Sequence, residues 1–148
     1  MNHFAYGSRS TRKLETCHPA LQEIADEALA RSPYDIAIIH GLRGKEAQNA
    51  LYASNASTKT WPNSRHNGSQ DDVIINPNEF SDALDFAPWV NRTIYWNDTH
   101  IFAVIAGCFF AAASAVGYEI RWGGDWDMDG QSTDQRLMDW GHIELKWK

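Results

Sequence analysis

The sequence has little cysteine, no run of basic residues and no continuous apolar stretch in residues 1–15. Its 148 residues include two cysteines, Cys17 and Cys108, too few for a disulfide framework or a cysteine-based zinc site. Lys and Arg number 13 against 19 Asp and Glu, which gives a formal net charge of −6. We therefore expect no nucleic-acid partner. The N-terminal residues 1–15 lack the continuous apolar stretch of a signal peptide.

The composition that is present is that of an ordinary globular protein, with 43% hydrophobic and 22% charged residues. A chain of this length can bury one hydrophobic core, so we expect residues 1–148 to form a single domain and the protein to be a monomer. Residues 101–118 hold no charge, and their length is at the lower edge of the roughly 17–25 residues of a membrane span. Because this segment is rich in Ala and Gly and lacks flanking Lys or Arg, we expect a fully buried core helix and no stable membrane insertion.

The hydrophobic pattern predicts short helices and strands separated by turns. Helices are predicted from Pro19 to Ser32, over Lys45–Ala53 and over Thr99–Val116, where Gly117 serves as the C-cap. Strands are predicted at 34–39, 83–86, 119–122 and 141–147, the second of them closed by Pro88. This pattern favours an α+β protein with a small, largely antiparallel sheet packed with helices.

Two histidines and one aspartate lie where a metal site can form. His66 lies in a long polar loop, His142 begins the last predicted strand, and Asp85 has apolar neighbours in a predicted strand. A carboxylate in apolar surroundings needs a partner, because burying an unpaired charge is costly. Two His and one Asp without Cys suit a zinc ion at the sheet with one position open to water, whose pKa zinc lowers to about 7.

A further carboxylate is needed to accept the proton of that water. Asp139 lies three residues before His142 and suits this role of general base. Glu144 is the alternative, because positions 142 and 144 share one face of a strand. Glu144 could instead orient His142 by a hydrogen bond, and the residues alone leave this choice open.

Three segments carry a resemblance to a known family: Ser64-Arg65-His66, the run 81–88 around Asp85, and Asp139-Trp140-Gly141-His142. Together they resemble the zinc peptidases of the D-alanyl-D-alanine carboxypeptidase type. Gly41-Leu42-Arg43, followed by Gln48, is similar to the arginine segment of that family. The run 122–126, Trp-Gly-Gly-Asp-Trp, resembles its short phage members, the L-alanyl-D-glutamate endopeptidases or endolysins.

The resemblance implies a role for each matching residue. His66, Asp85 and His142 would bind zinc, Asp139 would be the general base, and Arg43 would bind or polarise the substrate. Ser64 would support the site by hydrogen bonding. Asp85 follows His66 at a longer spacing than is common in the family, so residues 67–80 would hold an insertion, which a loop tolerates. Asp71 and Asp72 lie closer to His66, but the context Ala-Leu-Asp-Phe-Ala-Pro favours Asp85.

The function that the resemblance implies is metal-assisted hydrolysis of an amide bond in the peptidoglycan stem peptide, by a phage endolysin that cleaves between L-alanine and D-glutamate. Two alternatives stay open: a D-alanyl-D-alanine carboxypeptidase or dipeptidase on the same scaffold, and a zinc-bearing cell-wall-binding module without catalysis. We expect the protein to wait in the host cytoplasm and to reach the cell wall through a separate membrane pore.

The acidic segment 125–134 is a candidate calcium site. Residues 125–130 follow the pattern D-x-D-x-D-G, the first half of a calcium loop. Arg136 stands where such loops usually carry glutamate, so other oxygen ligands must complete the set. The ligands would be Asp125, Asp127, Asp129, Gln131 and Asp134. The segment also resembles a calcium-regulated loop of some phage endopeptidases, and we expect calcium to order the approach to the catalytic residues.

Overall fold

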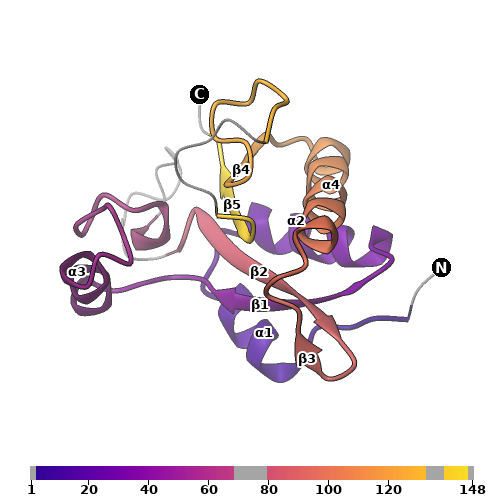
Figure 1. Ribbon diagram of the computed structural model, residues 1–148, viewed down its shortest axis with the longest axis horizontal. Coiled ribbons are helices and arrows are strands. Elements are labelled where there is room, and N and C mark those ends of the chain that lie inside the picture. Colours follow the sequence, from indigo (N-terminus) through magenta and orange to yellow (C-terminus); the bar gives the residue numbers. More distant parts are fainter. Residues whose placement is uncertain (1–2, 69–79, 133–138, 147–148) are drawn as a thin grey trace.

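The computed structural model describes residues 3–68, 80–132 and 139–146. Its α-helices α1 to α4 span Ser8–Leu14, Pro19–Arg31, Lys45–Ala53 and Thr99–Val116 (Figure 1). A 3-10 turn, η1, covers Arg65–Asn67. The strands β1 to β5 span Asp35–His40, Ala83–Val90, Thr93–Ile94, Ile120–Trp122 and His142–Leu145.

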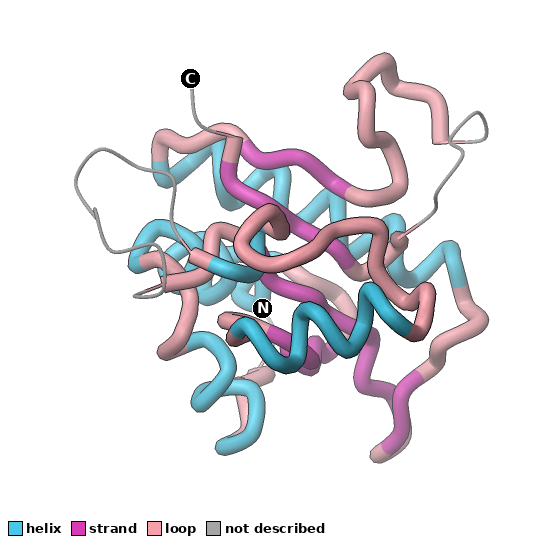
Figure 2. The backbone as a smooth tube through the Cα atoms, turned by 90° about the vertical axis from the view of Figure 1, so that its left-hand side faces the viewer, coloured by secondary structure: helices cyan, strands magenta, loops and turns pink. Residues whose placement is uncertain are grey.

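The strands form an antiparallel sheet whose order differs from their order in the chain. β1 pairs with β2, β2 with β5 and β5 with β4, while β3 pairs with the far end of β2. The C-terminal strand β5 therefore lies inside the sheet beside β2, as the tube in Figure 2 also shows. The predicted α+β class with a small antiparallel sheet is confirmed.

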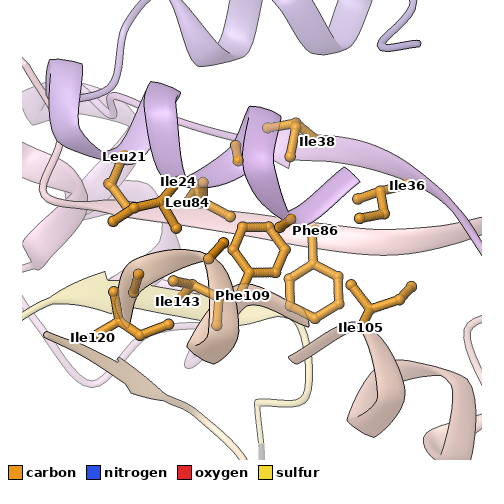
Figure 3. Packing of buried hydrophobic residues seen from close by; sticks show 14 of the residues in the cluster. Leu21, Ile24, Ile36, Ile38, Leu84, Phe86, Ile105, Phe109, Ile120 and Ile143 are labelled. Atoms are coloured by element: carbon orange, nitrogen blue, oxygen red, sulfur yellow. The ribbon is translucent and has the colours of Figure 1, made fainter. Parts of the chain in front are cut away.

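Helices α2 and α4 pack against each other and cover one face of this sheet. Figure 3 shows the side chains between the layers, where Phe86 of β2 stacks on Phe109 of α4 with ring centroids 5.1 Å apart. Leu84 and Phe86 are both buried in this core. Because neighbouring residues of a strand point to opposite faces, their burial turns Asp85 toward the face that α2 and α4 leave uncovered.

Helix α4 has the predicted bounds but not the predicted burial. The Asp98 carboxylate caps its start, and Gly117, with φ 94°, ends it. The expectation of burial on all sides is wrong, since Val104 is 44% and Phe110 38% exposed. An uncharged sequence looks apolar all round whether or not both faces are covered, and only tertiary packing distinguishes the cases. By length and composition the helix could also cross a membrane, and 33% of it is buried inside the protein.

Helix α1 is absent from the sequence prediction. Its buried residues are Ser10 and Leu14, which is too weak a periodicity to indicate a helix. It packs along β1, and the Ser10 hydroxyl accepts a hydrogen bond from the Ile38 N–H at 2.9 Å. This bond satisfies a backbone group at the edge of the sheet, where unpaired N–H groups invite association with other chains.

Strand β2 continues past Pro88, although the sequence predicts its end at Phe86. The Pro88 carbonyl accepts a hydrogen bond from the Tyr95 N–H at 3.3 Å, on the side of β3. The N and O atoms of a residue in an antiparallel strand point to the same neighbour. The missing N–H of Pro88 therefore faces β3 and leaves the pairing with β1 intact. Trp147, predicted in the last strand, lies outside the described residues.

Candidate metal centre and active site

Three separate segments bring His66, Asp85 and His142 together on the face of the sheet opposite α2 and α4. Asp85 of β2 pairs directly with His142 at the start of β5. His66 lies in η1, whose start is held by a reciprocal cap: the Ser64 hydroxyl accepts from the His66 N–H at 3.2 Å, and the Asn67 side chain accepts from the Ser64 N–H at 3.0 Å. Ser64 thus supports the site by fixing the turn that carries His66.

The geometry of these three side chains fits a metal ion. Asp85 Oδ1 lies 3.3 Å from His66 Nε2 and 3.2 Å from His142 Nδ1, and one ligand atom from each residue lies within 4.8 Å of the others. Ligands on a tetrahedral zinc ion, with bonds of about 2.0–2.1 Å, are roughly 3.3 Å apart. The predicted set therefore has both the donor types and the spacing of a site that can hold a divalent metal ion.

The outer nitrogen of each imidazole has a hydrogen-bond acceptor. His66 Nδ1 lies 2.8 Å from the Gly41 carbonyl oxygen, and His142 Nε2 lies 2.9 Å from Glu144 Oε1. With an N–H donated to each acceptor, the other nitrogen presents its lone pair beside Asp85. Such outward hydrogen bonds orient the rings of metal-binding histidines and set their tautomers.

The two candidate bases have different surroundings. Glu144 is buried and bonded to His142 Nε2, the nitrogen that faces away from Asp85, and its other oxygen lies 2.9 Å from Arg121 and 3.5 Å from Arg65. Burial alone would raise the pKa of Glu144, but His142 and the two arginines lower it. The Glu144 carboxylate is therefore ionised, and it holds the His142 ring at the nitrogen that faces away from Asp85.

Asp139 lies on the other side of this histidine. Its Oδ2 is 4.0 Å from His142 Nδ1, and its side chain is 49% exposed. Partial burial and the neighbouring carboxylate of Asp85 raise the pKa of Asp139, which makes it a stronger proton acceptor once ionised. Gly123 permits this position, because a Cβ there would collide with the Asp139 backbone, to which Gly123 is hydrogen-bonded at 3.0 Å. The Trp-Gly-Gly run thus has a steric role.

Arg43 lies at the edge of the site, where the buried side-chain amide of Gln48 holds its guanidinium. Its Nη2 lies 4.0 Å from Asp85 Oδ2, and its Nη1 donates to Gln48 Oε1 at 2.9 Å. Gln48 is fully buried, and its Nε2 donates to the Ser57 hydroxyl at 2.9 Å and to the Lys59 carbonyl at 2.6 Å. The amide therefore ties Arg43 to the loop after α3, a role that the sequence pattern alone does not reveal.

Two residues that contact the candidate metal ligands, His40 and Trp126, were not predicted to do so from the sequence. His40 Nδ1 lies 2.9 Å from Asp85 Oδ2; its position just before Gly41-Leu42-Arg43 is the available signal. The ring of Trp126 lies 5.1 Å from that of His142, and the Arg121 guanidinium lies over Trp126 at 5.4 Å. Trp126 belongs to the acidic segment, which therefore contacts a candidate metal ligand.

The charges of the site favour a cation. Burial alone would raise the pKa of Asp85, but His66, His142 and His40 hold it well below its usual range. Burial would likewise lower the pKa of His142, yet its hydrogen bonds to Asp85 and Glu144 raise it to about 9. A proton is thus strongly held between these carboxylates, and a divalent cation gains from the same arrangement.

The acidic segment gathers three carboxylates. Ligand atoms of Asp125, Asp127 and Asp129 lie within 4.8 Å of one another. Asp125 Oδ2 accepts from the Gly130 N–H at 3.0 Å, whereas its Oδ1 is buried without a hydrogen-bond partner among the described residues. Asp134, the fifth predicted ligand, lies outside the described residues, as do Asp71 and Asp72, the alternatives to Asp85. The segment presents oxygen atoms suited to a hard cation.

Comparisons with known proteins extend over nearly the whole chain. A protein family described as phage L-alanyl-D-glutamate peptidase matches residues 2–146. The L-alanyl-D-glutamate peptidase of Escherichia phage T5 is 35% identical over 147 residues, and the match covers 96% of this chain and 98% of that protein. The crystal structure of the Serratia marcescens L-Ala D-Glu endopeptidase ChiX has a similar fold, with a TM-score of 0.74 at 24% identity over 96% of this chain and 90% of that one.

Proposed function

Because the chain belongs to the family of phage L-alanyl-D-glutamate peptidases, we propose that it is an endolysin that hydrolyses the amide bond between L-alanine and D-glutamate in the peptidoglycan stem peptide. The observation that carries this proposal is the cluster of His66, Asp85 and His142, with ligand atoms within 4.8 Å of one another, beside Asp139. Residues 1–148 would form one catalytic domain that acts as a monomer.

We propose zinc as the metal, held by His66 Nε2, Asp85 Oδ1 and His142 Nδ1. When bound, zinc supplies a Lewis acid and lowers the pKa of water to about 7. Asp139 accepts a proton from the attacking water, whose oxygen bonds to the L-alanyl carbonyl carbon. Asp139 then delivers that proton to the D-glutamate nitrogen as the amide C–N bond breaks. Arg43, held by Gln48, donates hydrogen bonds to the negative charge that develops on the substrate.

The products of peptidoglycan digestion test this function. We expect mass spectrometry to find stem peptides that begin with D-glutamate, with L-alanine retained on the glycan. Release of terminal D-alanine would instead indicate the carboxypeptidase alternative. Binding to the cell wall without release of a new amino group would indicate the non-catalytic module. Either result would overturn the proposal.

The substrate also bears on where the protein acts. Peptidoglycan lies outside the cytoplasmic membrane, whereas phage proteins are made in the host cytoplasm. We propose that the enzyme accumulates in that cytoplasm and reaches the cell wall through a separate membrane pore. The uncovered apolar face of α4 would then remain in water, without stable membrane insertion.

We propose calcium as the ligand of the acidic segment. Its support is the buried Asp125 Oδ1 without a partner among the described residues and the three gathered carboxylates. Since Trp126 of this segment contacts His142, an ion there would steady the wall of the catalytic site.

Lytic activity should therefore rise with free calcium. Replacement Asp127→Asn should abolish this rise while leaving the calcium-free rate unchanged, because a neutral amide binds calcium more weakly than a carboxylate. Glu23→Gln, at an exposed acidic residue of α2, is the matched control and should keep the response. Turbidity loss of permeabilised cells across buffered calcium concentrations measures it, and a flat response of the unmodified enzyme would contradict the proposal.

A further inference from the structure

We infer that His40 is a positioning residue of the metal centre: it holds the outer oxygen of Asp85 so that the inner oxygen faces His66 and His142. This inference rests on the proposed metal site and concerns a residue for which neither the motifs nor the spacing assigned a role. It predicts a contribution to metal affinity from a side chain that does not itself bind the metal.

The two oxygens of Asp85 have separate partners. Oδ1 lies 3.3 Å from His66 Nε2 and 3.2 Å from His142 Nδ1, on the side where a metal ion would be held. Oδ2 lies 2.9 Å from His40 Nδ1 and 4.0 Å from Arg43 Nη2. With His40 donating its Nδ1–H, rotation of the carboxylate would break the shorter of the contacts at Oδ2. The hydrogen bond thus fixes the orientation of the carboxylate, with one oxygen toward the proposed metal site.

An irregularity in strand pairing gives His40 this position. Ile38 of β1 pairs with Phe86 of β2, but the next pair is His40 with Asp85. Ile39 is therefore an additional residue, as in a β-bulge. In a regular ladder Ile39, and not His40, would lie opposite Asp85. Bulges often redirect a side chain beside an active site. Here the bulge exchanges an apolar partner of Asp85 for a hydrogen-bond donor.

Gly41, the first residue after β1, also has a fixed position. A Cβ at Gly41 would collide with the Thr16 side chain, so the strand end passes close to the chain after α1. The Gly41 carbonyl oxygen lies 2.8 Å from His66 Nδ1. His40, the last residue of β1, and Gly41, which follows it, therefore hold two of the proposed ligands from outside, Asp85 through the His40 ring and His66 through the Gly41 carbonyl.

The surroundings of His40 distinguish it from a ligand. In the part of the chain that the structure describes, the ligand atoms gathered within 4.8 Å come from His66, Asp85 and His142 and not from His40. Its side chain is 55% exposed, whereas those of His66 and His142 are 3% and 9% exposed. Hydrogen bonds to the ligands of a metal typically change metal affinity by about 10–100-fold.

Zinc affinity measured by competition with a chromophoric chelator tests the inference. We expect His40→Ala to weaken zinc binding by about 10–100-fold and His40→Gln, which keeps an N–H donor, to restore most of it. His100→Ala, at an exposed histidine of α4, is the control and should bind zinc as tightly as the unmodified protein. The melting temperature of each metal-free variant shows whether the fold is retained.

The possible outcomes separate this inference from the proposed function. Unchanged zinc affinity in His40→Ala would overturn the positioning role, while the unmodified enzyme would still bind zinc and cleave its substrate. A cobalt-substituted His40→Ala protein should keep its visible absorption bands, whereas loss of a direct ligand would alter them. If the unmodified protein binds no zinc, it is the proposed metal centre that fails.

Discussion

Replacing Asp139 by asparagine should lower turnover by about 10²–10⁴-fold, the usual contribution of a positioned general base, while zinc stays bound. Asparagine has nearly the same shape, so packing against Gly123 is preserved, but its amide cannot accept the proton of water. The Oδ2 atom of Asp139 lies 4.0 Å from His142 Nδ1, close to the metal site without being part of the ligand cluster. The measurements are kcat on a defined muropeptide and the zinc content of the purified variant.

Glu144→Gln is the informative comparison for Asp139. Glu144 accepts the hydrogen bond that orients His142 and lies 2.9 Å from Arg121, so its loss should weaken zinc binding more than it slows the zinc-loaded enzyme. If Glu144→Gln abolished turnover at full zinc occupancy while Asp139→Asn stayed active, the assignment of the base would have to be reversed.

Replacing His142 by alanine should abolish both zinc binding and hydrolysis. His142 supplies a ligand atom 3.2 Å from Asp85 Oδ1, and alanine leaves two protein ligands where catalytic zinc sites normally have three. The variant should differ from Asp139→Asn in one respect: it lacks the metal, whereas Asp139→Asn retains it. Metal analysis of both proteins alongside their rates makes this comparison.

Removal of the metal from the unmodified enzyme should reproduce this loss. A chelator should reduce hydrolysis to the rate of the enzyme-free control, and added zinc should restore it, because the site residues remain in place. His100→Ala, at an exposed histidine outside the site, should behave as the unmodified enzyme throughout. Full activity after complete metal removal would refute metal-assisted hydrolysis.

Part of the fold could be predicted because its signals are local. The ranges 45–53 and 99–116 agree with α3 and α4, since spacing of apolar residues and the glycine C-cap act within one helix. The continuation of β2 through Pro88 could not be predicted, because it depends on which neighbour the missing N–H faces. The exposure of Val104 and Phe110 likewise depends on whether another element covers that face of α4.

Part of the site could also be predicted. His66, Asp85 and His142 stand out by residue type and motif, and the fold brings them together despite the long segment between His66 and Asp85. Which of Asp139 and Glu144 is the candidate general base could not be resolved from spacing, since both lie near His142 in the chain. The tertiary structure distinguishes them, because Glu144 lies at Nε2 of the His142 ring and Asp139 lies on the side of Nδ1.

The sequence by itself determined the chemistry available to this protein: the imidazoles and carboxylates, the apolar helices and the turns that separate them. These properties belong to individual residues and to short runs of chain. Only the tertiary structure decided that one oxygen of Asp85 faces His66 while the other faces His40. That choice depends on the register between β1 and β2 and on one additional residue in the pairing, and register is set by contacts between distant segments.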